Sequence, residues 1–165
     1  MGLVFVRAAV CDAGADDMMA SVYLRALVVL GTIAFAMGSL SHAGIDIPLG
    51  FTTIDEPSIG PATFVEGVIA LTFAIAAFAV SRRRRWAREA LRTALLVGIG
   101  GVLLGMSALA AGRGPHTELN DLFHVVALAA MFVGWNVASS DGARRALAPR
   151  RDSAHADAAG PLAAR

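Results

Sequence analysis

The chain has 165 residues, of which 56% are hydrophobic and only 16% are charged, and its formal net charge is +1. A soluble domain needs fewer apolar residues and usually carries about a quarter charged residues, so little of this protein's surface is suited to water. The single cysteine, Cys11, excludes an internal disulfide, and no Cys-x-x-Cys or Cys/His cluster is present to form a structural zinc site.

Residues 1–22 are expected to form an N-terminal extension, because they mix acidic and basic side chains and show little periodicity. Met18 and Met19 directly precede the first apolar stretch and offer an alternative start of translation. In a second interpretation, Arg25 begins a signal peptide that is cleaved at Ser41–Ala43, and this cleavage would leave three membrane spans.

Four apolar stretches of about 20 residues follow along the chain, and a helix of that length covers the bilayer core of about 30 Å. Inside the hydrocarbon every peptide group must be bonded within the protein, which a helix achieves alone. The sequence therefore predicts an all-α fold, a four-helix transmembrane bundle over residues 23–140. The expected spans are Ala26–Ile45, Ile59–Val80, Thr93–Gly112 and Leu119–Ala138.

Arginine residues gather in the link between the second and third spans, before the first span and after the fourth, whereas the two other links hold only Arg113. The positive-inside rule then places both termini in the cytoplasm of a multi-pass protein of the inner membrane. Beside a membrane span such a run usually sets topology, so nucleic acid is excluded as a partner and the lipid bilayer is the expected one. The link between spans two and three contributes Arg82, Arg83, Arg84, Arg85, Arg88 and Arg92.

The first outer link, residues 46–58, is long for a helical hairpin and mixes apolar residues with turn formers. One interpretation folds it over the bundle as a lid, with Asp46, Asp55 and Glu56 attracting cations to the opening of a pocket. A simple acidic loop in contact with water is the alternative.

A short motif recurs 54 positions apart: Gly60-Pro-Ala-Thr63 begins the second span and Gly114-Pro-His-Thr117 begins the fourth. This repeat predicts two tandem helical hairpins related by a pseudo-twofold axis along the membrane normal. The alternative is that Gly, Pro and Thr are ordinary residues at helix starts.

Small residues are expected at the helix contacts, because lipid provides no hydrophobic drive for helices to associate. Gly101, Gly105 and Ala108 form a stripe on the third span, and Gly31 and Gly38 share one side of the first. These stripes fit packing inside the bundle, and they fit equally an interface in a homo-oligomer or a larger membrane complex.

Polar residues within the spans are the best indication of activity, since charge inside a membrane is costly. His42, Glu66, Asn120, Asp121 and His124 all lie toward the outer leaflet, where a shared ligand-binding pocket could form. Imidazole and carboxylate groups suit a divalent metal or a proton relay. The candidate metal ligands are His42, Glu66, Asp121 and His124, with His116 as a fifth.

Other interpretations of the same residues remain open. Histidines on two helices, His42 and His124, could bind a haem. Glu66 could instead complete a capping box with Thr63, and Asp121 could interact with the helix dipole. His124 could donate to Asp121 or to a backbone carbonyl as structural glue.

The segment Asn120-Asp-Leu-Phe-His124, which begins the last apolar helix, resembles the Asn/Asp-x-x-His helix starts of small uncharacterised bacterial four-helix membrane proteins. The likeness covers mainly the third and fourth spans. It implies a membrane helical bundle and transfers no catalytic role. The long first outer link and Glu66 have no counterpart in that pattern.

Residues 141–165 are rich in Ala, Arg, Asp and Pro and are expected to form a disordered cytoplasmic tail. No catalytic motif is present, so an enzyme is disfavoured. The sequence predicts an accessory membrane subunit whose outward-facing polar pocket binds a metal ion, a proton or a small ligand. The alternatives are a subunit of an oligomeric transporter or channel, and a metal or haem oxidoreductase.

Overall fold

The computed structural model describes residues 2–50, 53–54, 57–114 and 117–148, with side chains from residue 17 onward. This part of the chain forms five helices and one two-stranded hairpin. The elements are α1 (Gly2–His42), β1 (Ile47–Pro48), β2 (Thr53–Ile54), α2 (Gly60–Ser81), α3 (Ala87–Ala110), α4 (Glu118–Ser139) and α5 (Asp141–Ala146).

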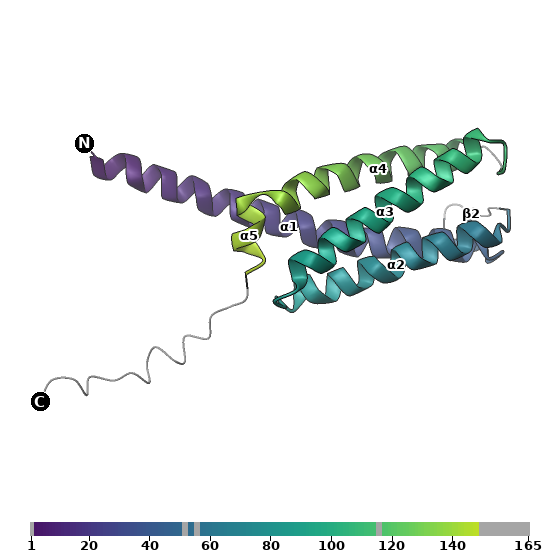
Figure 1. The fold of residues 1–165 in the computed structure, drawn as a ribbon, viewed down its shortest axis with the longest axis horizontal. Helices are drawn as coiled ribbons and strands as arrows, with labels where there is room; N and C mark the ends of the chain where they lie inside the picture. The colour runs from purple at the N-terminus through teal and green to yellow at the C-terminus, as the bar shows by residue number, and fades with distance from the viewer. Residues whose placement is uncertain (1, 51–52, 55–56, 115–116, 149–165) are drawn as a thin grey trace, which may run out of the picture.

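The four long helices lie side by side as an up-and-down bundle (Figure 1). Contacts run from α1 to α2, from α2 to α3 and from α3 to α4, and contacts between α1 and α4 close the ring. Each of these helices contains a segment long and apolar enough to cross a membrane. The predicted all-α fold and its four long apolar helices are thereby confirmed.

Helix α1 is much longer than the predicted first span. Its 41 residues correspond to about 60 Å at 1.5 Å per residue, and its N-terminal part extends well beyond the other helices (Figure 1). No break separates the predicted N-terminal extension from the bundle, because the first proline of the chain is Pro48 and nothing before it interrupts the helix. The candidate membrane span within α1 is Asp17–His42.

Gly44 determines where α1 ends. It lies three residues before the start of β1 and one residue before Ile45, the predicted end of the first span. Gly44 has a φ of +85°, the left-handed conformation that glycine adopts without steric cost. Its N–H donates to Ser41 O at 2.9 Å, and the N–H of Ile45 donates to Leu40 O at 3.1 Å. This pair of bonds is the Schellman arrangement that satisfies the last carbonyls of a helix.

Glycines allow the helices to approach closely within this one chain. A Cβ atom added at Gly31 of α1 would lie 2.6 Å from Phe73 of α2, and one added at Gly101 of α3 would lie 2.6 Å from Ile69 of α2. Phe73 and Ile69 are themselves almost fully buried. The predicted glycine stripes on the first and third spans thus contact other helices of the same bundle.

The outer faces of the bundle are apolar. Only 17% to 33% of each membrane-span window is buried inside the protein, and large side chains such as Leu30, Leu71, Leu104 and Val126 are more than half exposed. Exposing this much hydrocarbon to water would be unfavourable by about 25 cal/mol per Å². The four helices therefore suggest a membrane protein whose lipid-facing surface is these apolar side chains.

The structure differs from the predicted disordered tail at residues 141–146, which form α5. Ser140 caps this helix by accepting a hydrogen bond from the N–H of Ala143 at 3.2 Å, and Ala143 and Leu147 are buried against the bundle. Asp141 in the first turn and arginines in the last turn also suit the helix dipole. The remainder of the predicted tail, residues 149–165, lies outside the described residues.

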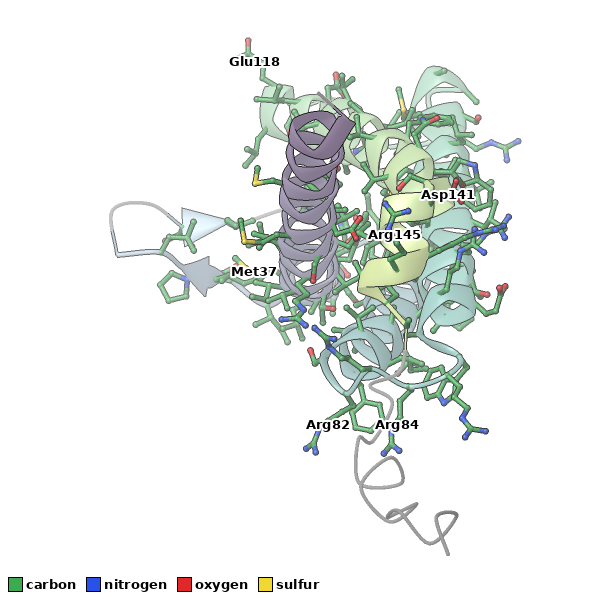
Figure 2. All side chains as sticks on the ribbon, turned by 90° about the vertical axis from the view of Figure 1, so that its left-hand side faces the viewer. Met37, Arg82, Arg84, Glu118, Asp141 and Arg145 are labelled. Atoms are coloured by element: carbon green, nitrogen blue, oxygen red, sulfur yellow. The ribbon has the colours of Figure 1, made fainter. Side chains whose placement is uncertain are left out.

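The first outer link forms the antiparallel hairpin of β1 and β2, in which Ile47 pairs with Ile54 and Pro48 with Thr53. The hairpin projects sideways from α1 (Figure 2), and Ile54 of β2 lines the smaller of the two pockets described below. Asp46 is exposed, and the other two acidic residues proposed for the pocket opening, Asp55 and Glu56, lie outside the described residues.

The two proposed repeat motifs occupy different positions relative to their helices. Gly60 is the first residue of α2 and Pro61 follows it in the first turn, whereas α4 begins only at Glu118, after its N-cap Thr117. In the second motif, residues 115–116 lie outside the described residues. Local geometry at the helix starts thus gives no support to a duplicated hairpin.

Candidate functional site

A pocket of about 330 Å³ lies among the helices at the end of the bundle where α1 ends and α2 begins. Residues of α2, α3 and α4 form most of its wall, and α1 contributes Phe35 and His42. Most of the lining is apolar, including Val65, Ile69 and Leu104. The polar and charged residues that line it are His42, Glu66, Arg113, Asn120 and His124.

His42, the last residue of α1, faces Glu66 of α2. The distance from His42 Nε2 to Glu66 Oε1 is 3.8 Å, and the two residues are only 6% and 7% exposed. The other ring nitrogen, His42 Nδ1, donates to the carbonyl oxygen of Pro57 at 3.3 Å. The pair is therefore buried, and the imidazole is oriented by the backbone of the link that leads into α2.

Glu66 does not complete a capping box, because α2 begins earlier than that interpretation requires. The N-cap of α2 is Ile59, which makes no side-chain cap, and the hydroxyl of Thr63 donates to Ile59 O at 3.2 Å. Glu66 lies almost two turns into the helix, where its carboxylate packs against the backbone of Gly38. Gly38 is four residues before His42, so both lie on the same face of α1.

His124 approaches the pocket from α4 and is 8% exposed. Its Nδ1 donates to the carbonyl oxygen of Asn120, one turn earlier, at 2.7 Å. Its Nε2 turns toward α3: a Cβ atom added at Gly105 would lie 2.9 Å from it. The predicted role of His124 as a donor to a backbone carbonyl is thus seen, and Nε2 remains directed at a residue that also lines the pocket.

Asp121 is separated from this group. It lies in the first turn of α4 with Glu118, is exposed, and lines neither pocket, which fits the interaction with the helix dipole considered above. Glu118 also points away from the bundle (Figure 2). The structure therefore brings together His42, Glu66, Asn120 and His124 and places Asp121 outside the site.

Within the described part of the chain, no group of three or more His, Cys, Asp and Glu side chains is placed to hold a metal ion. Of the four residues proposed as metal ligands, Asp121 is exposed and lines neither pocket, and the other three line the first pocket without forming such a group. The proposed fifth ligand, His116, lies outside the described residues. A buried imidazole–carboxylate pair with a second imidazole across a pocket is what the geometry provides.

A second pocket of about 230 Å³ lies between α1 and α4 and shares His42, Glu66 and Asn120 with the first. Ser41 and Phe123 also line it. The hydroxyl of Ser41 is buried and has no hydrogen-bond partner among the described residues. The His42–Glu66 pair therefore stands in the wall between two pockets.

Sequence reasoning missed several residues of the site. Gly38 and Gly105 supply the space that Glu66 and His124 occupy, and Phe35 lines the first pocket. A signal for the first was present, because Gly38 and His42 are spaced i, i+4. Phe35 and Gly105 resemble ordinary packing residues, so no pattern in the sequence distinguishes them.

The chain matches no protein family, no curated protein and no solved structure. The resemblance to small bacterial four-helix membrane proteins therefore stays a prediction, and any function must be argued from the site itself.

Proposed function

We propose that this protein is a small multi-pass membrane protein that binds an amphipathic small molecule in the first pocket, as an accessory subunit rather than as an enzyme. The ligand's apolar body would lie among Val65, Ile69 and Leu104, and its polar group would lie among the buried polar side chains. Ligand sites commonly combine a mainly apolar lining with a few convergent polar groups in this way.

One observation carries the proposal: three ionisable side chains from three different helices are buried at one pocket. His42, Glu66 and His124 are each less than 9% exposed, in a bundle whose outer faces are apolar. A charged residue inside a membrane costs roughly 2.5 to 3.5 kcal/mol on insertion scales. Helix packing alone does not require three such residues, whereas binding a polar group does.

The proposal includes an orientation. Arg82 and Arg84 follow the C-terminal end of α2, whereas the pocket lies near its N-terminal end, at the other end of the bundle (Figure 1). The side chains of both arginines point away from the helices (Figure 2). Because arginine-rich links stay in the cytoplasm, the pocket would open toward the outer side of the inner membrane. This orientation supports a ligand that is received from the outer leaflet or from outside the cell.

The test fills the pocket without touching its polar groups. Ala108 of α3 lines the pocket, whereas Ala110 on the same helix is exposed and does not. We expect detergent-purified wild-type protein and Ala110→Phe to retain a small organic molecule, detected by mass spectrometry of a solvent extract, and Ala108→Phe to lose it. Equal amounts in all three preparations, or none in any, would contradict the proposal.

A further inference from the structure

Two arginines near the start of α3 contact the last two turns of α4, at the end of the bundle opposite the first pocket. We propose that Arg88 and Arg92 form a binding site for the phosphate group of an anionic phospholipid in the adjacent membrane leaflet. This site is separate from the pocket. The inference therefore goes beyond the proposed function and shares with it only the placement of the bundle in a membrane.

Contacts with α4 hold both guanidinium groups on one side of α3. Arg88 Nε donates to the carbonyl oxygen of Ala138 at 3.3 Å, and Cζ of Arg92 lies 5.0 Å from the centre of the Trp135 ring. The two arginines are four residues apart and so share one helix face. Both are only partly exposed. Two positive charges are thus held close together where α3 meets α4.

The charges of this arginine pair are not neutralised within the described part of the chain. No carboxylate there forms an ion pair with Arg88 or Arg92, and the neighbouring Glu89 is exposed. Like charges one turn apart on a helix repel each other. A guanidinium also carries several N–H donors, of which Arg88 uses only Nε in the bond to Ala138. The pair therefore offers both charge and hydrogen bonds to an anion from outside the chain.

The depth of the pair in a bilayer matches the level of lipid phosphates. Helix α3 has 24 residues, or about 36 Å, which is longer than the hydrocarbon core of about 30 Å. Its first turns therefore reach the headgroup region, where tryptophans such as Trp135 are also common. Guanidinium groups bind phosphate oxygens through paired N–H donors. An anionic lipid suits the site better than a zwitterionic one, whose own cation competes for the phosphate.

A second pair of arginines at the same end provides a comparison. Cζ of Arg82 and Cζ of Arg84 lie 6.0 and 5.5 Å from the centre of the Phe78 ring, but both side chains are exposed and point away from the helices (Figure 2). Such side chains lose more rotamer freedom on binding than side chains already held against a neighbouring helix. General attraction of anionic lipid would involve both pairs equally, whereas a preorganised site involves Arg88 and Arg92.

The experiment compares the two arginine pairs with two lipids. Full-length protein in a neutral detergent is titrated with phosphatidylglycerol, or with phosphatidylcholine of the same acyl chains, while the thermal unfolding midpoint is followed. We expect wild type to bind phosphatidylglycerol about tenfold or more tightly than phosphatidylcholine. The double variant Arg88→Gln/Arg92→Gln should lose this preference. Arg82→Gln/Arg84→Gln removes the same charge from the same end and should keep it.

Several outcomes would overturn the inference. Equal affinity of wild type for the two lipids, or an equal loss of preference in the two double variants, would show that no specific site exists. If millimolar inorganic phosphate stabilises wild type as much as phosphatidylglycerol does, the pair binds phosphate ions and the lipid assignment is wrong. Ala108→Phe fills the pocket at the other end and should keep the lipid preference; its loss there would place the lipid in the pocket instead.

A second measurement does not depend on the folding of the arginine variants. The chain has two tryptophans, and Trp86 is 44% exposed, so Trp86→Phe should fold and leaves Trp135 as the only tryptophan, in contact with Arg92. In this variant, phosphatidylglycerol with acyl chains brominated near the headgroup should quench the fluorescence at about tenfold lower concentration than brominated phosphatidylcholine. Equal quenching by the two lipids would contradict a site for anionic lipid beside Trp135.

Discussion

At the scale of single residues, the polar site depends on glycines that leave room for its side chains. Gly38 on α1 accommodates the carboxylate of Glu66, and Gly105 on α3 accommodates the imidazole of His124. Neither glycine has a positive φ, so each is required by the space around it and not by its backbone conformation. A methyl group would suffice to disturb either contact.

Replacing these glycines by alanine should displace the site while a nearby exposed glycine tolerates the same change. We expect Gly38→Ala and Gly105→Ala each to lower the free energy of unfolding by about 1 to 3 kcal/mol, because an added methyl group overpacks the contact. Gly100 on α3 has nothing within 4 Å of its Cβ position, so Gly100→Ala is the matched control and should be neutral or slightly stabilising. Unfolding in detergent, followed by circular dichroism, measures all three; equal stability of Gly38→Ala and Gly100→Ala would contradict the packing described.

A single hydroxyl joins α1 to α4 at a distance from the pocket. Tyr23 donates from its hydroxyl to the carbonyl oxygen of Ala130 at 3.0 Å. Tyr23→Phe should cost about 0.6 to 1 kcal/mol, the usual value of one hydrogen bond between membrane helices. Ser107→Ala is the control, because Ser107 donates to the carbonyl oxygen of Leu103 in its own helix at 2.7 Å. If Tyr23→Phe lowers the free energy of unfolding no more than Ser107→Ala does, the hydrogen bond between the two helices does not contribute to stability.

At the scale of secondary-structure elements, α5 is attached to α1 by a two-point ion pair. Arg145 Nε donates to Asp17 Oδ2 at 2.9 Å, and Arg145 Nη2 donates to Asp17 Oδ1 at 2.9 Å. The side chain of Arg145 is 57% exposed, so water and salt weaken the pair. The buried Ala143 and Leu147 hold α5 in place alongside it.

A double-mutant cycle of Asp17→Asn and Arg145→Gln should give a coupling free energy of about 0.2 to 1 kcal/mol at low salt and less at high salt. Arg144 provides the control, because its ion pair, at 3.9 Å, is with Asp141 of the same helix. The cycle of Asp17→Asn with Arg144→Gln should therefore show no coupling. Equal coupling in both cycles would mean that general charge, rather than the ion pair seen here, attaches α5.

The elements differ in how far the sequence predicts them. The four long helices could be predicted because a run of about 20 apolar residues admits few structures other than a helix. The helical segment before residue 17 and helix α5 could not be predicted, because neither shows a clear apolar periodicity. The sequence also did not determine where the helices begin. The N-cap of α2 is Ile59, which makes no side-chain cap, so α2 begins earlier than a capping box with Thr63 requires. Glu66 therefore lies inside the helix and lines the pocket instead of capping the helix.

The site was predictable in part for the same reason. Depth in the membrane follows from position along a span, so His42, Glu66 and His124 could be assigned to one level. Whether a side chain points into the bundle or away from it depends on how the helices pack, and the sequence alone does not determine that packing. Asp121 lies only three residues before His124, yet it is exposed while His124 is buried.

At the scale of the whole molecule, the arrangement of charge predicts how the protein sits in a membrane. Arg82, Arg83, Arg84 and Arg85 follow α2 at one end, and the pocket lies at the other. A reporter active only in the cytoplasm should be active when fused after Trp86, and a periplasmic reporter should be active when fused after Gly114. The same fusions to a variant with Arg82–Arg85 replaced by Gln should show weaker discrimination. Periplasmic activity after Trp86 would reverse the proposed orientation and place the pocket on the cytoplasmic side.

Helix α1 has a mechanical consequence. From Asp17, held by α5, to His42, in the wall between the two pockets, it runs without interruption for 26 residues, or about 38 Å. Because the helix is continuous, a tilt at the Asp17 end would be carried to His42 rather than absorbed at a hinge. The attachment of α5 and the wall between the two pockets are therefore joined by one rigid element.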